Sequence, residues 1–160
     1  MLPRAFMCIL TKPHHCLHQI NAQATNKRMA RLTRLWNAHW YGNLYLKKPS
    51  SAGDSGRKWT WESVFVVVQG HRIVWWRDER QFDEAETPIG HILLSGHAGL
   101  AGLSPLDLRE LRNDEAERTV NVFGRGCGGQ QKVGFLTMDC NEKSLLEGAI
   151  IKAAEDDKIQ

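Results

Sequence analysis

The stretch formed by residues 59–76, WTWESVFVVVQGHRIVWW, limits the fold of this chain more than any other part of it. It predicts two strands, over residues 61–69 and 72–77, because runs of β-branched and aromatic residues fit a pleated, half-buried surface. Between them, Gly70 can adopt the positive φ of a tight turn. A hairpin alone is only marginally stable in water, so this one requires a larger sheet around it.

The 160 residues leave room for one domain of ordinary size and an additional segment. Hydrophobic residues make up 42% of the chain, which is enough for a packed core. No apolar run reaches the roughly 20 residues that cross a bilayer, and the apolar patch in MLPRAFMCIL is shorter than the core of a signal peptide. We therefore expect an intracellular protein whose cysteines are reduced, namely Cys8, Cys16, Cys127 and Cys140.

The formal net charge of +3 conceals two parts of opposite sign. Residues 1–53 contain eight basic residues and no acid, a charge of +8, and the rest contains 13 basic and 18 acidic residues, a charge of −5. A positive segment attracts an anionic surface through a field that salt screens beyond about 10 Å at 0.1 M. Anionic lipid and nucleic acid both present such a surface.

Residues 1–20 show little periodicity, and we interpret them as a flexible leader. The motif His14-His15-Cys16-x-His18 contains residue types that bind zinc, but a zinc site needs about four ligands held by a fold, so no metal site is expected. Acylation of Cys8 or Cys16 stays open, although the chain has no Met-Gly start for myristoylation. An organelle transit segment over residues 1–39 is a further open reading.

A helix is expected over residues 21–39, capped by Asn21 or Thr25. Spacings of three and four predict an apolar stripe, formed by Met29, Leu32, Leu35 and Trp36. The adjacent basic strip is our candidate for membrane or partner contact and consists of Arg28, Arg31 and Arg34. Such a helix either lies on an anionic membrane or packs on the domain that follows.

Residues 40–157 are expected to form one domain. Strands are predicted at residues 41–48, 61–69, 72–77, 89–94, 97–102, 119–123 and 133–138. A short helix over residues 105–112 begins with a capping serine and a proline. Asp139-x-x-Glu142 is a capping box that opens a closing helix, with an apolar stripe of Leu145, Leu146, Ala149, Ile150 and Ala153. The predicted class is mainly β with α, a seven-stranded bent antiparallel sheet or barrel capped by the C-terminal helix, with an added N-terminal helix.

The order and spacing of these elements resemble those of a pleckstrin homology (PH) domain over roughly residues 41–156. The matching segments are Gly42-x-Leu44, Trp61-x-x-x-Phe65-Val66-Val67-Val68-x-Gly70, Ile73-x-Trp75-Trp76, Pro88-x-Gly90-x-Ile92-x-Leu94 and Phe135-x-Thr137-x-Asp139 with Leu146-x-x-Ala149-Ile150. The tryptophan that is nearly constant in the family's helix is Leu146 in this chain.

The resemblance implies a non-catalytic module without a cofactor. Many PH domains bind inositol phospholipids through a lysine on strand one and [Lys/Arg]-x-Arg on strand two, and others bind other anionic lipids or proteins. The second-strand positions correspond to Glu62 and Val64, which cannot bind a phosphate, so the chain resembles a divergent member without the usual motif.

A cationic rim around the first loop remains for the lipid headgroup, formed by Lys47, Lys48, Arg57 and Lys58. Each such residue contributes about 1 kcal/mol near an anionic membrane, so weak and salt-sensitive binding is expected. The alternative is a solvated loop that only keeps a strand edge polar.

The glycine-rich segment at residues 124–129 contains a formal G-x-G-x-x-G. A dinucleotide loop joins a strand to a helix, whereas strands are predicted on both sides here, so we interpret it as a hairpin loop. Cys127 has no histidine at a spacing that indicates a catalytic dyad. No RNA-binding signature is present, and no nucleic-acid partner is expected.

These observations predict a monomeric, cytoplasmic, membrane-peripheral adaptor that binds anionic phospholipid weakly. The alternative is a protein–protein interaction or scaffold module without lipid binding. Such a module would use the outer face of the hairpin, the segment at residues 105–112 or the N-terminal helix.

Overall fold

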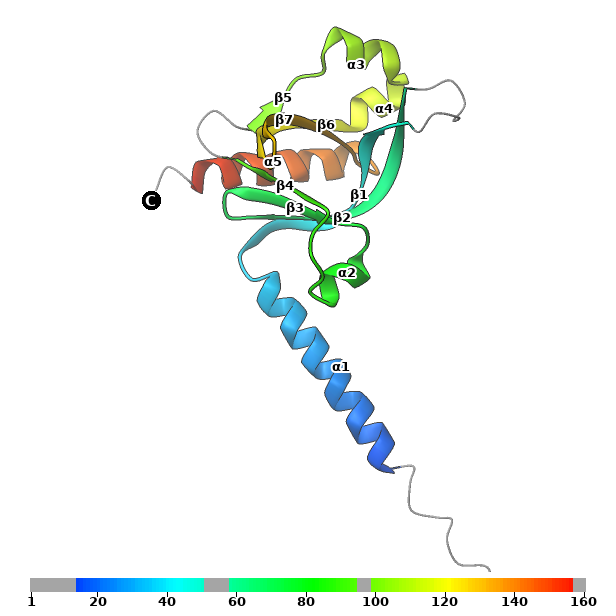
Figure 1. Ribbon diagram of the computed structural model, residues 1–160, viewed down its shortest axis with the longest axis vertical. Helices are drawn as coiled ribbons and strands as arrows, with labels where there is room; N and C mark the ends of the chain where they lie inside the picture. The colour runs from blue at the N-terminus through cyan, green and yellow to red at the C-terminus, as the bar shows by residue number, and fades with distance from the viewer. Residues whose placement is uncertain (1–13, 51–57, 95–98, 157–160) are drawn as a thin grey trace, which may run out of the picture. The chain divides into compact units, whose positions relative to one another are not determined.

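The computed structural model describes residues 14–50, 58–94 and 99–156, with side chains from residue 22 onward (Figure 1). The chain divides into two units, Met1–Arg34 and Leu35–Gln160. The first unit contains helix α1 (His14–Arg34). The second contains strands β1 (Ala38–Pro49), β2 (Trp59–Gln69), β3 (Arg72–Trp76), β4 (Gly90–Leu93), β5 (Gly99–Ala101), β6 (Thr119–Gly126) and β7 (Gly129–Leu136), and helices α2 (Glu79–Asp83), α3 (Pro105–Glu110), α4 (Asn113–Arg118) and α5 (Cys140–Asp156).

The strands of the second unit form one antiparallel sheet in the order β4-β3-β2-β1-β7-β6-β5. β1 joins the two halves of this sheet, because it pairs with β2 along its length and with β7 at Tyr45 and Leu46. An additional pairing of β4 with β6, between Leu93 and Arg125, closes the bent sheet into a barrel. The fold class predicted from the sequence is confirmed.

The β2–β3 hairpin is buried on both faces. Alternate residues of its strands point into the barrel core: Val64, Val66, Val68, Ile73 and Trp75. The residues between them contribute to a second apolar cluster on the outer face, where Phe65 and Val67 pack with Phe82, Leu35, Ala38 and Trp76. Gly70 has a φ of 55°, as the turn requires. The hairpin therefore lies in the centre of one half of the sheet and supports two layers of side chains.

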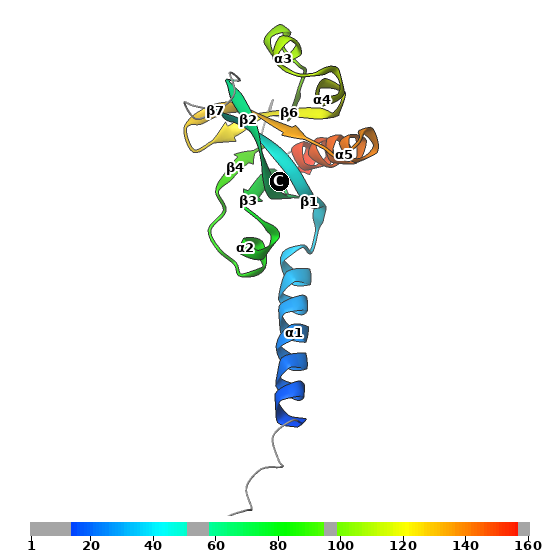
Figure 2. The ribbon, with the colours of Figure 1, turned by 90° about the vertical axis from the view of Figure 1, so that its right-hand side faces the viewer.

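Helix α5 contacts strands of both halves of the sheet, β1, β2 and β3 in one and β5 and β6 in the other (Figures 1 and 2). Its buried stripe consists of Leu146, Ala149, Ile150 and Ala153, as predicted. The prediction that Leu145 belongs to this stripe is wrong, because Leu145 is 59% exposed. One residue rotates a helix by about 100°, which places Leu145 beside the stripe rather than on it.

Helix α1 both begins and ends earlier than the predicted residues 21–39. Asn37 has a φ of 65°, a left-handed conformation that ends helices, and Ala38 N–H donates to the carbonyl of Leu35 at 2.9 Å. From Ala38 onward the backbone bonds to β2 instead of continuing the helix. Leu35 consequently packs into the outer cluster, and Trp36 is 73% exposed.

The sequence pattern predicts neither α2 nor α4. The helix predicted at residues 105–112 corresponds to α3, which ends two residues earlier, at Glu110. α2 begins at the carboxylate of Asp78, which accepts from Gln81 N–H at 2.9 Å, and its buried residue is Phe82. A five-residue helix with one apolar side chain has no periodicity to detect. β6 and β7 extend further than predicted toward their turn, because the pairing continues to Gly126 and Gly129 through polar residues.

Candidate ligand-binding surfaces

The predicted first-loop rim lies where β1 passes into β2. Lys47 pairs with Trp61 and Lys48 with Thr60 in the ladder, and Ser50 N–H donates to the carbonyl of Lys58 at 2.9 Å. Lys58 is exposed. The predicted rim residue Arg57 lies outside the described residues. Because neighbouring residues of a strand point to opposite faces, Lys47 and Lys48 lie on different sides of the sheet.

Lys48 forms an ion pair with Glu62 on the neighbouring strand. Both side chains are more than one-third exposed, so the pair contributes little stability. It does reduce the positive charge that Lys48 offers to another anion. Glu62 therefore neutralises a member of the predicted rim.

Lys47 is more enclosed than Lys48, with a side-chain exposure of 19%. Its Nζ lies 3.2 Å from Asp107 Oδ1, 3.5 Å from Glu110 Oε2 and 5.1 Å from the centre of the Trp59 ring. A cation over an aromatic face gains electrostatic stabilisation, which adds to the two ion pairs. The structure therefore connects Lys47 to helix α3.

Asp107 is the centre of this polar cluster. Its carboxylate accepts from Lys132 Nζ at 2.6 Å, from Ser104 N–H at 2.9 Å and from Ser104 Oγ at 2.7 Å, and Asn121 Nδ2 lies 3.4 Å away. Burial alone raises the pKa of Asp107, but the hydrogen bonds from Lys132, Ser104 and Lys47 outweigh it and hold the pKa well below its usual range. The carboxylate is therefore ionised at neutral pH.

Sequence reasoning missed Lys132 and Asn121 as members of this cluster. The available signal was weak: Asn121 is a polar residue inside the otherwise apolar strand TVNVF, and it is 4% exposed. A buried amide needs hydrogen-bond partners, so such a residue indicates a polar site nearby. Nothing in the spacing indicates that Lys132 reaches the same carboxylate.

The basic strip of α1 is partly as predicted. Arg28 is exposed, while Arg31 and Arg34 are half-buried. Met29 and Leu32, one turn apart, are 58% and 52% exposed. Leu35 and Trp36 lie beyond the end of the helix, so the apolar stripe on α1 is shorter than predicted.

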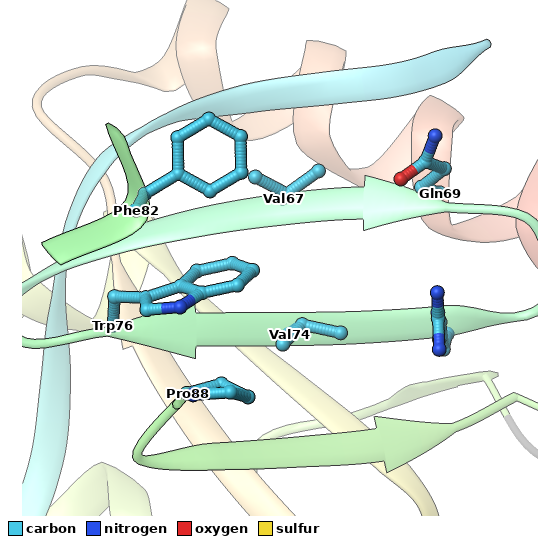
Figure 3. Close-up of a pocket in the computed structure, with 7 residues that line it drawn as sticks. Val67, Gln69, Val74, Trp76, Phe82 and Pro88 are labelled. Atoms are coloured by element: carbon cyan, nitrogen blue, oxygen red, sulfur yellow. The ribbon is translucent and has the colours of Figure 1, made fainter. Parts of the chain in front are cut away.

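The outer face of the hairpin carries a shallow cavity of about 190 Å³ (Figure 3). It is lined by Val67, Gln69, Arg72, Val74, Trp76, Phe82 and Pro88. Trp75 points into the core and Trp76 to this face, as alternation along the strand requires. Trp76 Nε1 donates to the Glu86 carbonyl at 2.9 Å, which fixes its ring at the end of the cavity.

Two of the remaining sequence motifs, the glycine-rich segment and Cys127, lie at the β6–β7 hairpin. Strands β6 and β7 pair through the glycine-rich segment as far as Gly126 and Gly129, so the turn lies at residues 127 and 128 and the interpretation as a hairpin is confirmed. Cys127 Sγ lies 3.9 Å from His91 Nδ1 on the surface. No group of three potential metal ligands occurs among the described side chains, which do not include the motif at residues 14–18. Where the chain is described, no helix combines the length and apolar character that crossing a membrane requires.

No protein-family model matches the sequence, and no curated protein matches it either. Solved structures do match the fold. The human PH domain of pleckstrin homology domain-containing protein family A member 5 aligns with 73% of this chain and 77% of its own, with a TM-score of 0.51 and 20% identity. The C-terminal PH domain of human pleckstrin aligns over 75% and 90%, with a TM-score of 0.52 and 16% identity.

A chain in the crystal structure of SifA and SKIP also aligns, over 72% of this chain and 97% of its own, with a TM-score of 0.52 and 13% identity. At these identities the likeness establishes the fold, and the chain has the PH fold that its sequence pattern resembles.

Proposed function

We propose that this protein is a cytoplasmic adaptor that attaches weakly to membranes containing anionic phospholipids, with phosphatidic acid or phosphoinositide headgroups. The observation that carries the proposal is the charge division of the chain, because residues 1–53 have a charge of +8 and no acidic residue. A segment of this kind is attracted to an anionic bilayer at long range and is released by salt. The PH-fold unit then acts as the module that is brought to the membrane.

Two groups of basic residues contribute unequally in this proposal. Lys47 and Lys48 of the first-loop rim are paired with carboxylates of the chain itself, whereas Lys58 is exposed. Arg28, Arg31 and Arg34 of α1 lie in the acid-free segment, beside the exposed Met29 and Leu32, and an apolar side chain beside a basic strip favours the membrane interface. We therefore assign the larger share of the attraction to α1.

Sedimentation with phosphatidylcholine vesicles that contain phosphatidic acid or a phosphoinositide tests the proposal at low and high salt. Charge reversal of Arg28, Arg31 and Arg34 should remove most of the binding, and reversal of Lys47, Lys48, Arg57 and Lys58 should remove a smaller part. A matched control reverses three exposed arginines of the acidic part, Arg77, Arg80 and Arg125, and should retain most of the binding. Absence of wild-type binding at low salt would contradict the proposal.

The second candidate function is a protein-interaction module without a lipid role. The observation that favours it is the cavity on the outer face of β2 and β3, where apolar side chains lie beside Gln69 (Figure 3). Arg72 also lines this cavity. If the vesicle experiment shows no binding at low salt, this function replaces the first.

A further inference from the structure

A groove of about 470 Å³ lies between the first residues of β1 and helix α5, two elements that contact each other (Figure 2). Its β1 wall is formed by three consecutive residues, Ala38, His39 and Trp40. Because neighbouring residues of a strand point to opposite faces, a groove that all three line runs along the edge of the strand. Its other wall is one side of the helix, formed by Ser144, Leu145, Gly148, Ala149 and Lys152.

The edge of β1 in this groove is open. β2 occupies the opposite edge, because it pairs with β1 from Ala38 to Pro49. On the groove side, β7 is the one described strand that pairs with β1, and it does so only at Tyr45 and Leu46. Within the described part of the chain, the backbone of residues 39–44 therefore has no strand partner on that side. An unpaired edge of this kind can accept a further strand through its N–H and C=O groups.

The two walls of the groove are joined by a hydrogen bond between side chains. The register of β1 with β2 shifts between Ala38 and Trp40, so His39 is the extra residue of a β-bulge. His39 Nε2 lies 2.7 Å from Oδ2 of Asp156, the last residue of α5. This bond connects the start of β1 to the end of α5. The groove thus keeps its width without an occupant, which lowers the cost of binding.

Apolar surface is exposed along the helical wall. Leu145 is largely exposed, and Gly148 lies almost one turn further along the same side of the helix. A Cβ at Gly148 would meet no atom within 4 Å, so the glycine leaves open space beside Leu145. Trp40, on the β1 wall, packs against the barrel core. An aliphatic side chain of a ligand over Gly148 would cover Leu145, and the groove has the volume of about 300–1,000 Å³ that is typical of ligand sites.

The helical wall also carries a positive charge. Lys152 is exposed, lines the groove one turn beyond Gly148 and forms no ion pair with a described side chain. Asp156, one turn further, is bound to His39. A carboxylate of a ligand can therefore pair with Lys152 without displacing an acid of the chain itself, and this complementarity favours an acidic partner.

We infer that this groove binds an extended segment of a partner protein, which adds as a strand to the open edge of β1 beside α5. The segment carries an aliphatic side chain for the space over Gly148 and an acidic residue for Lys152. Its main-chain bonds supply affinity, and the two side chains supply specificity. The inference goes beyond both functions proposed above, because the groove contains neither the basic residues of α1 and the first-loop rim nor any residue of the outer-face cavity.

Random heptapeptides displayed on phage test the inference on the whole protein. Selection on the wild type, with removal of peptides that also bind Gly148→Leu, should yield sequences that combine an aliphatic residue with an acid. The added leucine side chain fills the space that the ligand needs, and we expect the fold to tolerate it because the position is open. Failure to select any such sequence would overturn the inference.

Calorimetry with a selected and synthesised peptide measures the contribution of each part of the groove. Gly148→Leu should weaken binding about tenfold or more, the scale of one buried aliphatic side chain. Lys152→Glu should weaken it about fivefold, the scale of an exposed ion pair, and Lys152→Arg should retain it. Asn141→Leu is the matched control, because it adds the same side chain to an exposed position of α5 outside the groove. Equal binding by Gly148→Leu and the control would contradict the inference.

Strand pairing has its own signature in the peptide and in β1. Neighbouring N–H groups of a strand point to opposite edges, so methylation of the peptide amides should abolish binding at every second position and be tolerated between them. In the wild-type protein, saturating peptide should slow the hydrogen exchange of those amides of residues 39–44 that point away from β2. This measurement needs no variant, so it decides the question even if Gly148→Leu fails to fold. Tolerance of methylation at every position, or unchanged exchange in this segment, would show that the peptide does not bind as a strand and would overturn the inference.

A second copy of the chain is another occupant that an open edge accepts. Sedimentation velocity of the wild type over a range of concentrations should show a monomer. Dimerisation that rises with concentration and is removed by Gly148→Leu would assign the groove to a second copy and overturn the assignment to a partner segment. Gly148→Leu changes no charge, so it should sediment with anionic vesicles as the wild type does, and the membrane proposal is tested separately.

Discussion

Adjacent lysines at the end of β1 have different electrostatic environments. Lys48 pairs with Glu62 at the surface, whereas Lys47 is largely enclosed between Asp107, Glu110 and the Trp59 ring. The first pair is weak because water screens it, and the second cluster holds a carboxylate whose pKa is depressed. The position of a lysine beside the first loop therefore does not show how much positive charge it has available for a ligand.

Gly124 shows how a residue of the glycine-rich segment serves the barrel. A Cβ at Gly124 would lie 2.2 Å from Ile92 Cγ2 and 2.5 Å from the Leu93 carbonyl oxygen, at the pairing that closes the sheet. Because one of these atoms is backbone, the strands must shift. We expect Gly124→Ala to lower the free energy of unfolding by about 2 kcal/mol, the scale of overpacking in a core.

Gly128→Ala is the matched control, because a Cβ there meets nothing within 4 Å. Urea denaturation followed by tryptophan fluorescence measures both variants. Equal stabilities would contradict a role of Gly124 in barrel closure.

The sequence predicts best those elements in which apolar residues recur at a regular period, which is about two in a strand and about 3.6 in a helix. The β2–β3 hairpin and α5 have the predicted types and nearly the predicted bounds, because burial of one face imposes a period on the side chains. α2 contains one buried residue, so it has no measurable period and the sequence does not predict it. α1 ends at Arg34, shortly before the left-handed backbone of Asn37, and the predicted apolar stripe through residue 36 gives no indication of that end.

Leu146 and Leu145 of α5 test whether the helix acts as the plug of the barrel. Leu146 is 1% exposed within the core, and Leu145 is 59% exposed. Leu146→Ala should lower the free energy of unfolding by about 2–5 kcal/mol through lost burial and a residual cavity. Leu145→Ala should change it by less than about 0.5 kcal/mol. Chemical denaturation of both variants provides the comparison, and a similar loss in each would show that α5 is not held by this stripe.

The whole molecule combines a barrel whose net charge is negative with an N-terminal segment whose charged residues are all basic. The charge division can be read directly from the sequence, because it needs only a count along the chain. The polar cluster around Asp107 cannot, because Lys47, Asn121 and Lys132 are brought together by the pairing of β1, β6 and β7. The sequence therefore predicts which part of the chain is basic, and the structure is needed to show that carboxylates of the chain itself pair with Lys47, Lys48 and Lys132.

Removal of residues 1–34 separates these two properties. The remaining residues, 35–160, contain 15 basic and 18 acidic residues, a net charge of −3 against +3 for the whole chain. They include Leu35 of the outer cluster, the complete barrel core and all six tryptophans. We expect the shortened chain to keep the near-ultraviolet circular dichroism and the cooperative melting of a folded barrel, because its core is intact.

The same shortened chain should lose most of its sedimentation with anionic vesicles at low salt, since the acid-free helix α1 is gone and the remaining net charge is negative. A shortened chain that stays folded and still binds vesicles like the whole protein would place the membrane contact on the barrel, at the first-loop rim, and would contradict the larger share assigned to α1.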